Sequence, residues 1–160
     1  MSGLRRTGGM PSALRLDDRF RWGLYGIFSV LFVTGSVWLI ADALKDSPSG
    51  DFWQGISASL LMIHGGAATV TLVLLGALIP IHVLRAWRSR RNRLAGAAMV
   101  IANVLLVATA FGLYYAGSDT WRPRISDVHI GVGLIFPALI VIHVMTGRRS
   151  LAVKDKEAPR

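Results

Sequence analysis

Apolar residues occupy four long stretches of this chain, separated by short polar segments. The stretches cover residues 22–41, 52–84, 94–117 and 128–147, and none contains Lys, Arg, Asp or Glu. A helix needs roughly 20 residues to cross the apolar core of a bilayer. It also satisfies its own backbone hydrogen bonds there, where no water can do so. The pattern therefore predicts an all-α integral membrane protein, folded as a four-helix bundle.

The polar segments suggest where the predicted helices begin and end. We expect a loop over residues 42–51, where Pro48 and Gly50 interrupt the helical pattern. A shorter loop containing residues 121–124 should precede the last helix, which we expect over 126–147. The predicted organisation is a basic tail (1–21), a four-helix domain (22–149) and a second tail (150–160). The first apolar stretch starts late and lacks a small-residue cleavage site, so we interpret it as a retained helix.

Positive charge is concentrated in three of the polar segments. Residues 1–21, 85–93 and 148–160 each carry five Lys or Arg, whereas the other two loops share three. Because Lys and Arg accumulate on the cytoplasmic side of membrane proteins, we predict that both termini are cytoplasmic. The net charge of +9 then reflects topology and contact with anionic lipid, and we expect no nucleic-acid partner.

The four histidines of the chain all lie in the second and fourth apolar stretches. His64 and His82 are 18 residues apart, which is five whole turns at about 100° per residue, so they share a helix face. His129 and His143 are 14 residues apart and also lie on one stripe. The predicted topology places His64 and His129 in the outer half of the membrane, and the other two near the cytoplasm. The sequence thus predicts one histidine from each helix at each of two depths.

Paired histidines at two depths suit the axial ligation of two haems. Two opposed imidazoles make a six-coordinate electron-transfer centre at haem iron. The absence of cysteine excludes thiolate ligands and covalent c-type attachment. Small residues beside the histidines would let a porphyrin approach the helix backbone, or would serve packing between helices instead. These residues are Gly65, Gly66, Gly131 and Gly133. The histidines could alternatively form a proton or metal-ion pathway, or no site at all.

Further candidates surround the histidines. Four arginines could bind haem propionates, although the topology of the protein alone also explains their positions. They are Arg122 and Arg124 on the outer side, and Arg85 and Arg148 on the cytoplasmic side. A quinone could bind near Tyr114, Trp121 and Asp127, although Tyr and Trp also form interfacial belts. Hydroxyl groups that could fix a ligand's second ring nitrogen are those of Ser57, Thr69, Thr71 and Thr146.

The two halves of the chain show traces of a repeat. Residues 81–84 (IHVL) precede an arginine cluster, as do residues 142–145 (IHVM). More loosely, residues 34–38 (TGSVW) parallel residues 109–113 (TAFGL). A duplicated two-helix unit would place related haem sites in both halves.

The pattern of Trp121, His129-Ile130-Gly131, Ile142-His143 and Arg148, partnered by His64 and His82, resembles the small bacterial di-haem cytochromes b with four transmembrane helices. Related helices occur in the cytochrome b subunits of formate dehydrogenase and nickel–iron hydrogenase. The resemblance covers about residues 22–149 and rests mainly on the histidine pairs. The 18-residue spacing departs from the more regular 14-residue spacing of quinol-oxidising cytochromes b, which leaves the pairing of His64 least secure.

This resemblance implies an electron-transfer oxidoreductase, or the membrane subunit of one, in the bacterial inner membrane. It implies two non-covalent haem b groups, ligated by His64 with His129 and by His82 with His143. Electrons would pass between a quinone or quinol and a soluble redox protein or dehydrogenase subunit. Two alternatives remain open: an oxidoreductase acting on superoxide or a metal ion at the outer haem, and a haem-free proton or metal transporter or scaffold.

Overall fold

The computed structural model describes residues 16–88 and 92–157, with side chains as far as Arg149. Every regular element in this part of the chain is helical. In order, the elements are α1 (Asp18–Ala43), α2 (Gly50–Leu78), the π-helix η1 (Ile79–Val83), α3 (Leu84–Arg88), α4 (Arg93–Tyr115) and α5 (Trp121–Glu157). Because α2, η1 and α3 are continuous, they form one span, and four helices are long and apolar enough to cross a membrane. The predicted all-α, four-helix membrane architecture is confirmed.

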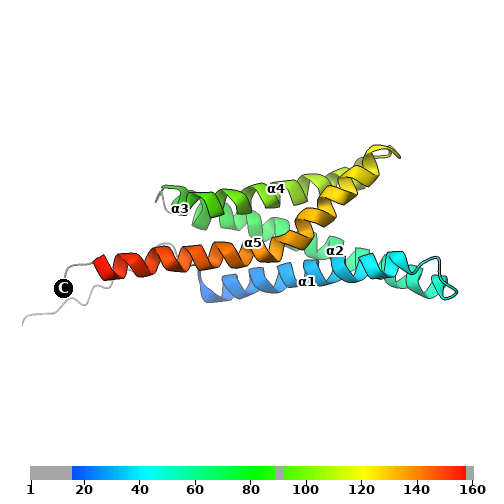
Figure 1. Ribbon diagram of the computed structural model, residues 1–160, viewed down its shortest axis with the longest axis horizontal. Helices are drawn as coiled ribbons and strands as arrows, with labels where there is room; N and C mark the ends of the chain where they lie inside the picture. Colours follow the sequence, from blue (N-terminus) through cyan, green and yellow to red (C-terminus); the bar gives the residue numbers. More distant parts are fainter. Residues whose placement is uncertain (1–15, 89–91, 158–160) are drawn as a thin grey trace, which may run out of the picture.

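The four spans form two antiparallel hairpins (Figure 1). α1 packs along α2, and α4 packs along α5. The hairpins meet chiefly through α1 and α5, where the rings of Phe28 and Phe136 pack edge to face with centroids 5.1 Å apart. Both hairpin loops lie at the same end of the molecule (Figure 1).

Most large apolar side chains point outward. Among the described residues, only five hydrophobic side chains are buried, and Phe136 is the largest of them. Residues such as Met62, Val73 and Ile101 are more than half exposed. In a membrane protein these side chains contact lipid tails, which are as apolar as the side chains themselves. Lipid is therefore a partner of this fold.

Several helix boundaries differ from those predicted, most clearly in α1 and α5. α1 begins at Asp18 rather than Trp22, because the Asp17 carboxylate caps the helix by accepting a hydrogen bond from the Arg19 amide at 3.0 Å. α5 begins at Trp121, so residues 121–124 form its first turn instead of a loop. Pro123 is compatible with that turn, where backbone amides have no partner within the helix. α5 also continues to Glu157, past the predicted helix end at 147. α1 and α5 therefore cross the predicted domain limits at 22 and 149.

Parts of the predicted basic segments lie outside the described residues. These parts are residues 1–15 of the N-terminal tail, residues 89–91 of the linker between the hairpins, and residues 158–160 of the C-terminal tail.

The two prolines within the spans mark irregular helix geometry. Pro80 lies in η1, where the Leu84 amide reaches back five residues to the carbonyl of Ile79. Pro137 lies inside α5, and Figure 1 shows α5 bending part way along its length. Proline lacks an amide hydrogen and clashes with the carbonyl four residues earlier, which explains both departures from a straight α-helix.

Candidate functional site: two histidine pairs

The four histidines meet in two pairs, each joining the first hairpin to α5. The rings of His64 and His129 have centroids 6.3 Å apart, with planes at 72°. Those of His82 and His143 have centroids 6.2 Å apart, with planes at 81°. We call these the outer pair and the inner pair, after the predicted topology. The structure brings together the partners that the sequence indicated, including His64.

Threonines of the neighbouring helices hold the outer pair. The Thr34 hydroxyl oxygen of α1 lies 2.9 Å from Nδ1 of His64. On the other side, the Thr109 hydroxyl oxygen of α4 lies 2.8 Å from Nδ1 of His129. Each hairpin therefore supplies one histidine and the threonine that orients it.

The same hydroxyls determine which ring nitrogen carries the proton. Thr34 donates its only hydroxyl hydrogen to the carbonyl of Val30 at 2.7 Å, and Thr109 donates to the carbonyl of Leu105 at 2.6 Å. Each threonine oxygen is then left to accept from its histidine, so Nδ1 is the protonated nitrogen. Nε2 keeps its lone pair, which is the form a neutral histidine needs to ligate a metal.

A close helix approach accompanies the outer pair. A methyl group added to Gly35 would lie 3.3 Å from Cε1 of His64. Any larger residue here would press on the imidazole, so glycine at this position lets α1 approach close enough for Thr34 to reach His64.

The inner pair has different surroundings. His82 lies in η1, two residues after Pro80. Within the described part of the chain, Nδ1 of His143 is buried without a hydrogen-bond partner. One turn farther along α5, the Thr146 hydroxyl accepts from the side-chain amide of Asn92 at 2.8 Å and donates to the carbonyl of Ile142 at 2.8 Å. Asn92, in the left-handed region at φ 49°, thus ties the start of α4 to α5 beside the inner pair.

The unequal histidine spacings are accommodated by the helix irregularities. The histidines of α2 and η1 are 18 positions apart, whereas those of α5 are 14 positions apart. η1 contains His82, and Pro137 lies between the two histidines of α5. A π-turn changes the rotation of the residues that follow it, and a bend changes the axial distance between two points. Both pairs therefore meet despite the mismatch.

The spacing of each pair fits an iron atom between the rings. Metal–imidazole bonds are about 2 Å long and a ring nitrogen lies about 1.1 Å from the ring centre, so opposed imidazoles on one iron have centroids about 6.2 Å apart. The observed values are 6.3 and 6.2 Å. A methyl group added to Gly65, Gly66 or Gly131 would meet no atom within 4 Å, so packing between helices of this chain does not explain these glycines.

Three of the four hydroxyls singled out from the sequence bond their own helix instead of a histidine ring. Those of Thr69, Thr71 and Thr146 all donate to a carbonyl four residues earlier in their own helix. The orienting residues, Thr34 and Thr109, lie on the other helix of each hairpin. The loose repeat between residues 34–38 and 109–113 was the signal that could have identified them.

The predicted arginines are largely engaged elsewhere or exposed. Arg122 donates from Nη1 to the carbonyl of Leu113 at 2.9 Å and so caps the C-terminal end of α4. The guanidinium carbon of Arg124 lies 5.5 Å from the ring centre of Trp121. Arg85 and Arg148, next to the inner pair in sequence, are both exposed.

The residues considered for a quinone face outward. Tyr114 and Trp121 are 82% and 59% exposed, and Asp127 is exposed in the second turn of α5. A shallow hollow of about 550 Å³ lies instead on the first hairpin. It runs along α2 from Asp51 to Ile63, directly before His64. A quinone site at Tyr114, Trp121 and Asp127 remains a prediction.

Among the described side chains, in residues 16–88 and 92–149, His, Asp and Glu do not gather in any group of three that could hold a metal ion. The histidines meet in twos, which is the number that axial ligation of haem requires. Comparison with protein-family models, with curated proteins and with solved structures finds no match to the chain.

Proposed function

We propose that this protein is a membrane cytochrome b that carries electrons through two non-covalent b haems. His64 and His129 ligate one haem, and His82 and His143 ligate the other. The observation that carries the proposal is the pair of ring separations, 6.3 and 6.2 Å, each between residues of different hairpins. When bound, haem supplies one-electron redox chemistry that the side chains of the protein lack.

The chain's contribution is to present ligands in a fixed orientation. Thr34 and Thr109 keep Nδ1 of the outer histidines protonated, so their Nε2 atoms would be free to ligate the iron. Rigid helices hold the opposing rings on either side of the site, so little reorganisation is needed when the charge on the iron changes. Phe28 and Phe136 pack midway between the two pairs, since Phe136 is seven residues from each histidine of α5. This packing keeps the two sites apart.

The proposed electron partners are a quinone or quinol in the membrane and a soluble redox protein or dehydrogenase subunit. The protein would lie in a bacterial inner membrane with both termini cytoplasmic. On this topology the segments at residues 42–51 and 116–127 face outward and carry five Asp against three Lys or Arg. Net negative charge disfavours approach of an anion, which supports quinol over superoxide as the substrate.

Single substitution of each histidine tests the proposal. His64→Ala and His129→Ala should each leave one haem per chain, with the same residual spectrum. His82→Ala and His143→Ala should also leave one haem, with the complementary spectrum. Haem is counted by pyridine haemochrome assay on protein purified from membranes.

Met62→Ala serves as the control, because Met62 is two residues from His64 and 77% exposed; this variant should keep both haems. If His64→Ala and His129→Ala removed different haems, the pairing would be wrong. Wild-type protein that binds no haem would instead support a proton or metal pathway.

A further inference from the structure

The indole of Trp38 carries a hydrogen-bond donor that the described part of the chain does not satisfy. Its Nε1 atom is buried and has no hydrogen-bond partner there. An indole nitrogen donates and never accepts, and burying a donor without a partner destabilises the folded protein. Phe or Leu would fill the same space without this cost. The position of the donor therefore points to an acceptor that comes from outside the described residues.

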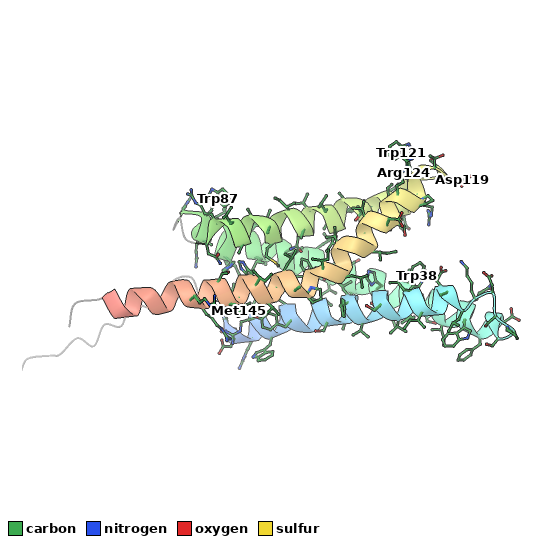
Figure 2. All side chains as sticks on the ribbon, in the orientation of Figure 1. Trp38, Trp87, Asp119, Trp121, Arg124 and Met145 are labelled. Atoms are coloured by element: carbon green, nitrogen blue, oxygen red, sulfur yellow. The ribbon has the colours of Figure 1, made fainter. Side chains whose placement is uncertain are left out.

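Trp38 lies next to the outer pair. It follows Thr34 by four residues on α1, which places it on the same helix face, about 6 Å farther toward the α1–α2 loop. Thr34 is bonded to His64, and Gly35 lies against the His64 ring. Figure 2 labels Trp38 on the half of α1 that leads to the α1–α2 loop. The donor thus lies one turn beyond the outer histidines, on the side of the hairpin loops.

The second hairpin has no equivalent of this indole. Thr109 corresponds to Thr34 by its bond to the paired histidine, and the residue four positions after Thr109 is Leu113. An apolar residue therefore suffices at this position for packing within a hairpin. Trp38 adds a donor to the outer site alone.

The cationic side chains at this end of the bundle already have partners. Lys45 pairs with Asp42 at 3.0 Å, Arg122 caps α4, and Arg124 lies over the ring of Trp121. A carboxylate entering the outer site would find Trp38 Nε1–H without a competing acceptor. Hydrogen bonds from a neutral donor to a carboxylate are stronger than those between neutral groups.

We infer that Trp38 Nε1–H donates a hydrogen bond to a propionate carboxylate of the haem held between His64 and His129. This inference rests on the proposed function and makes Trp38 a positioning residue that fixes the rotation of the macrocycle about the axis through its ligands.

The test measures release of haem from the purified holoprotein to excess apomyoglobin. Trp38→Phe keeps the ring and removes the donor, and should speed release of the outer haem about tenfold, as expected for loss of one hydrogen bond to a charged group. Release of the inner haem should be unchanged; comparison with His143→Ala, which retains the outer haem, assigns the two phases. The matched control is Trp22→Phe, at a position that is 66% exposed, and it should release both haems at the wild-type rate.

A second arm changes the ligand instead of the chain. Wild-type apoprotein reconstituted with haem dimethyl ester, which lacks the carboxylates, should release the outer haem faster by a similar factor. Trp38→Phe should add nothing further when the ester is bound. If Trp38→Phe fails to accumulate, the inference is still tested by comparing the release of haem and of haem dimethyl ester from the wild-type protein.

The outcomes separate this inference from the proposed function. Wild-type protein without haem would overturn both. Two haems per chain with equal release from wild type and Trp38→Phe would overturn the inference alone. An altered KM for quinol with unchanged haem release would also overturn it, because the indole would then serve the quinone.

Discussion

At the scale of single residues, the outer pair depends on two hydroxyls that do not belong to the histidine-bearing helices. Thr34 and Thr109 each bond Nδ1 of a histidine and a carbonyl of their own helix. Because the hydroxyl hydrogen is donated to the carbonyl, the threonine oxygen accepts a hydrogen bond from Nδ1–H of the histidine. This direction fixes the tautomer of the imidazole. Residues that hydrogen-bond a metal ligand in this way typically account for a factor of about 10–100 in metal affinity.

Thr34→Val should therefore weaken binding of the outer haem about 10–100-fold and raise its midpoint potential. Valine has the shape of threonine but accepts no hydrogen bond, so the His64 imidazole becomes a weaker electron donor to the iron. Thr109→Val should act in the same direction through His129. Haem titration and a potentiometric titration measure the two effects.

Thr71→Val is the matched control for these two variants. Thr71 is buried like Thr34, but its hydroxyl bonds only its own helix, at Ala67. Both haems should titrate normally in this variant. An unchanged outer potential in both Thr34→Val and Thr109→Val would contradict the assigned role.

The sequence predicted the histidines and their partnership but not these threonines. Periodicity along one helix shows which residues share a face, and this sufficed to match the histidines of α2 and α5. It does not show how α1 is rotated against α2, and that rotation decides that Thr34, rather than Ser57 or Thr69, reaches His64. The loose repeat held the information, because Thr34 and Thr109 begin its two copies.

At the scale of the helices, η1 is the element that presents His82. The sequence predicted a disturbance at Pro80 but not its form, because a proline is equally compatible with a kink and with a π-turn. In the structure the Leu84 amide bonds to Ile79, one residue beyond the usual partner. Short π-segments are frequent at functional sites, and this one coincides with the inner pair.

Pro80→Ala should loosen the inner site while leaving the outer one intact. Alanine restores an amide hydrogen at position 80, so the segment favours a regular α-helix and His82 rotates away from His143. Loss of the inner haem spectrum with retention of the outer one is the expected result. Pro48→Ala, in the loop between α1 and α2, is the control and should keep both. Equal effects of Pro80→Ala on both haems would argue against a local role for η1.

At the scale of the whole molecule, the two hairpins meet mainly between α1 and α5. The sequence predicted four spans and a duplicated two-helix unit, because hydropathy and repeat signals are local. It did not predict which helices join the halves, because that depends on packing between residues distant in the chain. Phe28 and Phe136 form this junction, midway between the two histidine pairs.

Phe136→Ala should destabilise the protein by about 2 kcal/mol or more, since it removes the largest buried side chain described here. Both haems should be lost more readily, because each is held between the same two hairpins. Thermal denaturation in detergent, followed at the haem absorbance, gives the measurement. The adjacent Ile135→Ala changes a lipid-facing residue that is 59% exposed and should melt close to wild type. If these two variants melted alike, the hairpins would not depend on this junction.

The most direct measurement is a reduced-minus-oxidised spectrum of the wild-type protein, expressed with adequate haem supply, together with its haem-to-chain ratio. We expect sharp low-spin b-type bands and two haems per chain. A chain that purifies folded from the membrane with no haem and no such bands would contradict the proposed function.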